Sequence, residues 1–210
     1  MYKTFGDISA MARPAQFDRK EAVSAAMNAI WRNGFSQSSV KTLSELLGIT
    51  RSSFYNAFES REALLREALS EYAAQSPDAV LHAEVTGLVR PLLTAVFRDI
   101  CRVRASDPEG RGCLVINTVC ELCPDTEGLG AELAELVLGS AERLETLLKI
   151  ARDSGEIPKG ADVHALALAL QNLMIGLNVL CKVVRSEEEL WLLTRTTLDG
   201  LGLLAGNGQA

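Results

Sequence analysis

Apolar residues recur along most of this chain at the three- and four-residue spacing of amphipathic helices, and no useful stretch alternates as a strand would. The first stripe predicts a helix from about Asp18 to Arg32, with Asp18 suited to cap its start and Gly34 to end it. Its apolar face consists of Val23, Ala26, Met27 and Ile30. The pattern as a whole predicts an all-α fold.

Two short helical segments follow, separated by a turn at Gly48. Ser39 and Thr50 are suited to cap the starts of these segments, and Phe54 and Phe58 share the inner face of the second one. Two short helices joined by a glycine turn form a helix-turn-helix pattern. We therefore expect an N-terminal domain of three helices.

The outer face of the second short helix has an unusual composition. A solvated helix face ordinarily carries Glu and Lys, whereas this one carries small hydroxyls, an amide, a phenol and a cation. Such groups hydrogen-bond to phosphates and base edges in nucleic acid, although each of them is also compatible with a plain solvated surface. They are Arg51, Ser52, Ser53, Tyr55 and Asn56, with Lys41 and Thr42 on the preceding segment.

A fourth helix is predicted from about Ser60 to Gln75, and longer helical patterns follow, interrupted by segments rich in proline and glycine. They span roughly Ala79–Ser106, Gly112–Leu122, Gly130–Ser154, Asp162–Val184 and Ser186–Leu204. Thr86-Gly87 and Pro91 are expected to kink the first of these.

The segment Asp162–Val184 is apolar nearly all round. It nevertheless contains Gln171, Asn172 and Asn178, which are costly in hydrocarbon without partners. We therefore expect no membrane span. A helix that must be covered on two sides suits one packed on its own core and also on a second subunit.

Charge and composition narrow the function classes. The chain has 210 residues, of which 48% are hydrophobic and 23% charged, with a net charge of −6, so it is an ordinary globular protein. Residues 1–60 nevertheless hold seven Lys and Arg against five Asp and Glu, so this end alone is suited to face nucleic acid.

Cysteine and histidine usage favours a cytoplasmic protein without a metal or other cofactor. Five cysteines are an odd number, and Met1–Ala12 lacks the apolar segment of a secretory leader, which predicts free thiols in a reducing compartment. His82 and His164 are remote from each other, and no nucleotide-binding, metalloprotease or serine-hydrolase motif is present. An enzyme is therefore not expected; a thiol-dependent one using Cys113 is the remaining alternative.

Three stretches resemble the TetR/AcrR family of bacterial transcriptional regulators: GFSQSSVKTL at 34–43, LGITRSSFYNAF at 47–58 and SREAL at 60–64. The resemblance spans about residues 18–66, and residues 112–117 are similar to one subgroup of the family. It implies a homodimeric repressor that binds near-palindromic double-stranded DNA and is released by a small-molecule effector. The implied organisation is a flexible arm over residues 1–15, in which Met11 is an alternative start, a DNA-binding domain over 16–62, and a ligand-binding and dimerisation domain over 63–210.

The resemblance also implies roles for individual residues. Tyr55 would place its hydroxyl on a phosphate, and Arg61 stands where the family usually has a lysine beside the DNA backbone. Ser52 departs from a frequent glycine. Together with the composition of the outer face, this predicts the following DNA-binding residues: Ser39, Lys41, Thr42, Thr50, Arg51, Ser52, Ser53, Tyr55, Asn56 and Arg61.

The last two predicted helices are expected to form the dimer interface, as they do in the family. The residues expected there are Leu168, Ile175, Val179, Trp191, Thr194, Leu198 and Leu201. Together with the DNA-binding helices, this pairing would set two recognition helices about one turn of DNA apart.

A ligand pocket is expected within the bundle of the middle helices. The candidate lining residues are Phe97, Cys101, Cys113, Asn117, Cys120, Glu121, Met174 and Asn178. Their apolar character favours a lipophilic or aromatic effector. Two interpretations of Cys113 stay open: a small core residue, or a thiolate near Arg111 and a helix N-terminus that senses electrophiles or oxidants.

Overall fold

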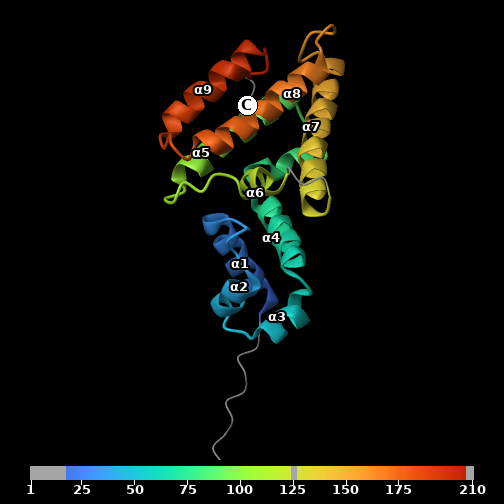
Figure 1. The fold of residues 1–210 in the computed structure, drawn as a ribbon. Coiled ribbons are helices and arrows are strands. Elements are labelled where there is room, and N and C mark those ends of the chain that lie inside the picture. The colour runs from blue at the N-terminus through green and yellow to red at the C-terminus, as the bar shows by residue number, and fades with distance from the viewer. Residues whose placement is uncertain (1–17, 124–126, 207–210) are drawn as a thin grey trace, which may run out of the picture.

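The computed structural model describes residues 18–123 and 127–206, and every regular element in these ranges is helical, which confirms the all-α fold. The elements are α1 (Arg19–Asn33), α2 (Val40–Leu46), α3 (Arg51–Phe58), α4 (Arg61–Gln75), the 3₁₀ helix η1 (Pro77–His82), α5 (Val89–Ser106), α6 (Leu114–Leu122), α7 (Leu129–Asp153), α8 (Val163–Leu180) and α9 (Glu187–Gly200). In Figure 1, α1 to α4 form one end of the molecule, α5 and α7 to α9 form the other, and α6 lies between them.

The predicted N-caps of the first helices are confirmed. The Asp18 carboxylate accepts hydrogen bonds from the backbone N–H groups of Lys20 and Glu21, at 2.8 and 3.2 Å. The hydroxyls of Ser39 and Thr50 do the same at the starts of α2 and α3. These caps satisfy backbone donors that would otherwise lack partners, so they fix where the short helices begin.

The N-terminal helices share one apolar core. Ile30 of α1, Leu43 of α2, and Phe54 and Phe58 of α3 are almost fully buried in it. The core continues along α4, whose Leu64 and other apolar residues belong to the same cluster, past the domain boundary expected at residue 62.

The helix expected over 79–106 is wrong in its first part, because the chain forms η1 and then an irregular segment before α5 starts at Val89. The Glu156 carboxylate accepts hydrogen bonds from the backbone N–H groups of Val89 and Arg90, at 2.9 and 2.8 Å. Pro91, expected to kink a helix, lies instead in the first turn of α5, where its missing N–H costs nothing.

Three other helix ends differ by a few residues from the expected ones. Gly112 has φ of 73°, a left-handed conformation, so α6 begins after it, at Leu114. Helix α8 ends at Leu180 instead of Val184, where the chain enters a turn. Helix α9 ends at Gly200, before Gly202 with φ of 70°.

Helix α8 has the length and apolar composition of a membrane-spanning helix, yet it lies in the core of the C-terminal body. Its buried polar side chains have partners in the protein: Gln171 accepts a hydrogen bond from the Ser140 hydroxyl at 3.1 Å, and Asn178 accepts one from Arg104. These contacts favour the expected core helix over a membrane span.

Candidate nucleic-acid interface and ligand cavity

The outer face of α3 is open to solvent. Arg51, Ser52 and Asn56 are exposed, and Tyr55 retains 52% of its accessible surface, while Phe54 of the same helix is fully buried. The Tyr55 ring meets the edge of Phe54 with ring centroids 5.9 Å apart. The polar cluster of residues 51–56 therefore points outward from a helix that is anchored by its apolar face.

Several of the predicted hydroxyl contacts are already used to hold the helix starts. The Thr50 and Ser53 hydroxyls lie 2.9 Å apart at the start of α3, and the Ser39 and Thr42 hydroxyls lie 2.7 Å apart at the start of α2. All four residues are exposed. They position the face and still present hydroxyl groups to solvent.

The cationic side chains near this face differ in their exposure and in their contacts with the rest of the protein. Lys41 and Arg51 are exposed, and no ion pair to either forms within the described ranges of the chain. Arg61 is instead held against the protein: its guanidinium lies 4.0 Å from the centroid of the Phe35 ring and donates to the Phe35 carbonyl at 3.4 Å. Lys41 and Arg51 are therefore the more accessible cations.

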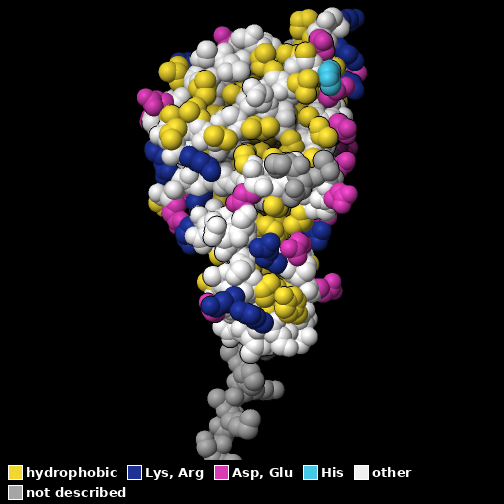
Figure 2. Space-filling view, viewed as in Figure 1, with side chains coloured by type: hydrophobic (Ala, Val, Ile, Leu, Met, Phe, Trp, Pro, Cys, Tyr) yellow, Lys and Arg dark blue, Asp and Glu magenta, His cyan; other side chains and the backbone are white. Residues whose placement is uncertain are grey.

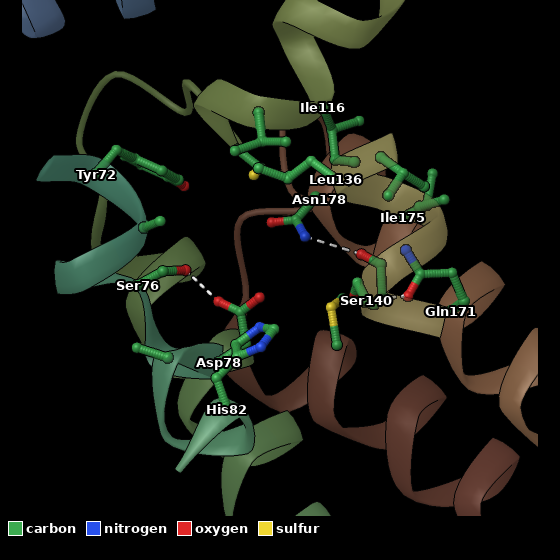
Figure 3. A pocket seen from close by; sticks show the side chains of 16 residues that line it. Tyr72, Ser76, Asp78, His82, Ile116, Leu136, Ser140, Gln171, Ile175 and Asn178 are labelled. Carbon is green, nitrogen blue, oxygen red and sulfur yellow. Dashed lines mark hydrogen bonds between the residues drawn. The ribbon is translucent and has the colours of Figure 1, made fainter. Parts of the chain in front are cut away.

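A cavity of about 330 Å³ lies between the two ends of the molecule (Figure 3). It is lined by the end of α4, by η1 and by parts of α6, α7 and α8. Of the predicted pocket residues, Cys113, Met174 and Asn178 lie on its wall. The other lining residues are Tyr72, Ala73, Ser76, Asp78, Ala79, His82, Val115, Ile116, Leu136, Val137, Ser140, Gln171 and Ile175.

Phe97 and Cys101, which were expected on the cavity, are not among its lining residues, because both are buried in the core of the C-terminal body. The Cys101 thiol lies 3.2 Å from the Thr194 hydroxyl, and burial raises the pKa of that thiol. A raised pKa disfavours the reactive thiolate, so Cys101 is a packing residue.

Asn117, Cys120 and Glu121 were also expected on the cavity and lie elsewhere. They line a separate depression of about 490 Å³ between α1 and α6. Cys113 is the N-cap residue of α6 and lines the first cavity instead, so the four side chains do not form one site. The Glu121 carboxylate accepts hydrogen bonds from the backbone N–H and hydroxyl of Ser36, at 3.0 and 3.2 Å.

Sequence reasoning missed a buried polar group behind the cavity wall. Arg104 is only 5% exposed, and its guanidinium donates to the Asn178 amide oxygen at 2.5 Å and to the Tyr72 hydroxyl at 2.8 Å. Burial raises the pKa of Tyr72, with a further contribution from Cys113 beside it. The available signal was position: Arg104 lies on the apolar stripe of α5 that also holds Phe97 and Ile100.

The residues expected at a dimer interface divide into two groups. Leu168 and Val179 are about half exposed, and Ile175, Trp191 and Leu201 are partly buried. Thr194 and Leu198 have no accessible surface, because they pack inside their own protomer. Their assignment to the interface was wrong: within α9 they lie on the inward face.

Salt bridges connect the N-terminal helices to the rest of the molecule. Arg32 of α1 pairs with Glu109 at 2.6 Å, and Arg66 of α4 pairs with Glu132 of α7 at 2.6 Å. Hydrogen bonds from the two arginines lower the pKa values of Glu109 and Glu132. Arg111 adds a stacking contact, with its guanidinium 3.9 Å from the Trp31 ring centroid.

Charged side chains of both signs lie on both ends of the face seen in Figure 2, and hydrophobic side chains gather over the C-terminal body. Within the described ranges, no group of three or more His, Cys, Asp or Glu residues is placed to hold a metal ion.

The fold and the site together define the class of protein. The helix α3 exposes a polar face, and it is joined to a helical body that contains a cavity. These features are those of a helix-turn-helix DNA-binding regulator.

Comparisons with known proteins identify the family. Residues 22–68 match the model for bacterial regulatory proteins of the tetR family, and residues 87–197 match the model for the Tetracyclin repressor-like C-terminal domain. The chain therefore belongs to the TetR family of transcriptional regulators, and the family expected from its sequence is confirmed.

Individual relatives agree with this assignment. The HTH-type transcriptional repressor ComR of Escherichia coli is 30% identical over 189 residues, covering 89% of this chain and 90% of the relative. A cysteine mutant of the TetR family transcriptional regulator CifR, solved with 26bp double-strand operator DNA, has a TM-score of 0.77 and 27% identity, covering 90% of this chain and 98% of that one. The reduced form of NemR from E. coli has a TM-score of 0.67 at 21% identity, covering 90% of this chain and 98% of that one, and shares the fold.

Proposed function

We propose that this protein is a homodimeric repressor whose two α3 faces bind one near-palindromic operator and whose cavity takes the effector that releases it. The observation that carries the proposal is the solvent-facing cluster of hydroxyl, amide, phenol and cation over residues 51–56 on a helix anchored by buried Phe54 and Phe58. These groups suit contacts to phosphates and base edges. The operator complex of the similar CifR supports the same use of the fold.

Dimerisation is proposed through α8 and α9. Leu168 and Val179 of α8 and Leu192 and Leu193 of α9 are large apolar side chains that are 42–52% exposed. Leu168 and Val179 are eleven residues, about three turns, apart and so lie on one face of α8, as expected for a helix that is covered in a two-fold pair. Burying these side chains against a second copy would remove apolar surface from water and place both DNA-binding ends in one assembly.

Release is proposed to run through the elements shared by the cavity and the N-terminal helices. Tyr72 at the end of α4 and Ile116 of α6 line the cavity, and Glu121 of the same α6 holds Ser36 just after α1. A ligand that moves α4 or α6 would therefore change the position of α1 and the attached α3. A coupling free energy of about 1–3 kcal/mol, which is roughly 5–150-fold in affinity, is enough for regulation.

The experiment is a mobility-shift titration with DNA from upstream of the protein's own gene. The combined variant Arg51→Ala with Tyr55→Phe is expected to lose most operator affinity. Lys159→Ala, which removes a positive charge from an exposed loop at the far end of the molecule, serves as the control and is expected to bind normally. Equal binding by the wild type and the combined variant would refute the proposed face.

A second candidate is a thiol-based sensor that uses Cys113. Cys113 lies on the cavity wall beside Tyr72, and the CifR structures that hold operator DNA carry cysteine substitutions. Alkylation with iodoacetamide would then release operator from the wild type and spare the Cys113→Ser variant. Cys120→Ser, which removes an exposed thiol outside the cavity, is the control and should respond as the wild type does.

A cytoplasmic location and the absence of catalytic activity complete the proposal. Both are supported by the TetR-family matches over residues 22–68 and 87–197, since members of this family act as regulators on DNA.

A further inference from the structure

The cavity wall has few ionisable side chains. Of the described residues that line it, Asp78 is the one carboxylate, His82 is the one imidazole, and none is a lysine or an arginine. Asp78 lies on η1 with His82 beside it, and Figure 3 shows its carboxylate directed towards the open space. A ligand that enters the cavity therefore meets one carboxylate and no lysine or arginine on the same wall.

Asp78 has acceptor capacity to spare. Its carboxylate accepts a hydrogen bond from the Ser76 hydroxyl, and no ion pair to it forms over residues 18–123 and 127–206. An ionised carboxylate offers about four acceptor positions on its two oxygens. One neutral hydroxyl leaves most of these open to a donor from a ligand.

The buried cation of this region does not neutralise Asp78. Arg104 is absent from the cavity lining, and its hydrogen bonds go to Asn178 and Tyr72, whose side chains stand between it and the cavity. A negatively charged ligand would thus lose its water without gaining a counter-charge. A ligand with a positive charge would instead gain a charge-assisted hydrogen bond at Asp78.

The rest of the wall is mainly apolar, although Ser140, Gln171 and Asn178 also line it. Ile116, Leu136 and Ile175, on α6, α7 and α8, lie across the cavity from Asp78 (Figure 3). Met174 of α8 is also a lining residue. A volume of about 330 Å³ is at the lower end of the range for sites that bind small organic molecules. The cavity therefore combines an apolar chamber with one acidic group at its η1 edge.

We propose that the effector class of this cavity is lipophilic amines, with the protonated amine donating to Asp78 and the hydrocarbon part lying among Ile116, Leu136 and Met174. This inference rests on the proposed function for the role of the cavity and adds the chemistry of its ligand. It makes Asp78 the residue that selects amines over neutral and acidic molecules of the same shape.

The test uses three matched probes: phenylbutylamine, phenylbutanol and phenylbutyrate. Each is titrated into the full chain by calorimetry at pH 8. The amine is expected to bind about tenfold more tightly than the alcohol, and the carboxylate more weakly than either. Asp78→Asn should remove the advantage of the amine and leave the alcohol nearly unchanged, whereas Glu84→Gln, an exposed acid outside the cavity, should keep it.

The proposal is overturned if the alcohol or the carboxylate binds as tightly as the amine, if none of the three binds, or if Asp78→Asn binds the amine as the wild type does. If the Asp78→Asn variant fails to fold, the order of the affinities of the three probes for the wild type still tests the proposal. A parallel mobility-shift assay keeps the two hypotheses apart. Failure to bind operator would contradict the regulator function, while amine selectivity is scored by calorimetry alone.

Discussion

The side chain of Arg104 connects three of the helices behind the cavity wall. It is almost completely buried, and its two hydrogen-bond partners, Asn178 and Tyr72, are 74 and 32 residues away in the sequence. Through them it connects α5 to α8 and to α4. A buried guanidinium must keep such partners, because each unpaired polar group in the interior costs free energy.

Replacing this residue should therefore be severe. Arg104→Ala leaves the Asn178 oxygen and the Tyr72 hydroxyl without their donor, and we expect the free energy of unfolding to fall by about 2–4 kcal/mol. Urea denaturation followed by circular dichroism measures this change. Arg102→Ala, on the same helix but exposed and paired with Asp99, should change stability by less than about 1 kcal/mol. Equal stability of the two variants would contradict the role given to Arg104.

Residues with local partners could be predicted from the sequence, and residues with distant partners could not. Thr50 caps α3 by accepting from Ser53, three residues on, and this was readable from the residue types alone. The partners of Arg104 depend on how three helices pack, which no local pattern specifies. The wrong placement of Phe97 on the cavity has the same cause. The sequence indicated on which face of its helix Phe97 lies, but not which other helices pack against that face.

The bounds of the helices were likewise predictable where local residues set them and not where distant residues do. The N-terminal helices carry their own start signals, so their bounds came within a residue or so of the expected ones. The start of α5 depends on the carboxylate of Glu156, 67 residues after Val89, and was missed. The broken segment before it forms η1 and brings Asp78 and His82 to the cavity, so an unpredicted break in a helix produced part of the candidate site.

Helices α8 and α9 form the proposed dimer interface. Leu168→Glu with Val179→Glu places two charges on the exposed face of α8, and we expect the dimer to dissociate because buried unpaired charges are costly at an interface. Light scattering after size-exclusion chromatography should give a dimer for the wild type and a monomer for the variant. Leu138→Glu, an exposed leucine on α7, is the control and should stay dimeric. A monomeric wild type would contradict the proposed assembly.

Two ion pairs that respond to pH connect the two ends of the molecule, in addition to the apolar core that α1 to α4 share with α6 and α7. The pKa values of Glu109 and Glu132 lie below their ordinary value of 4.5 because Arg32 and Arg66 donate hydrogen bonds to the carboxylates. A carboxylate whose pKa is lower in the folded state stabilises that state above the pKa of the unfolded chain. This contribution is lost as the pH falls through the folded pKa.

We therefore expect the free energy of unfolding to fall between about pH 5 and pH 3, with these two pairs responsible for part of the slope. The variant Arg32→Gln with Arg66→Gln should show a shallower fall over the same range. Urea titrations at half-unit steps of pH measure the two slopes. If the slopes coincide, the ion pairs do not contribute, and the connection between the ends must rest on other contacts.

The central claim is that the face formed by α2 and α3 binds DNA, and the dependence of operator affinity on salt tests it most directly. Each protein cation that neutralises a phosphate contributes about 0.9 to the slope of log affinity against log salt concentration. Lys41→Ala removes one exposed cation per protomer, so the slope of the dimer should become shallower by about 2. Lys159→Ala, with the same charge change far from that face, should keep the wild-type slope. A Lys41→Ala variant with unchanged affinity and slope would contradict the claim.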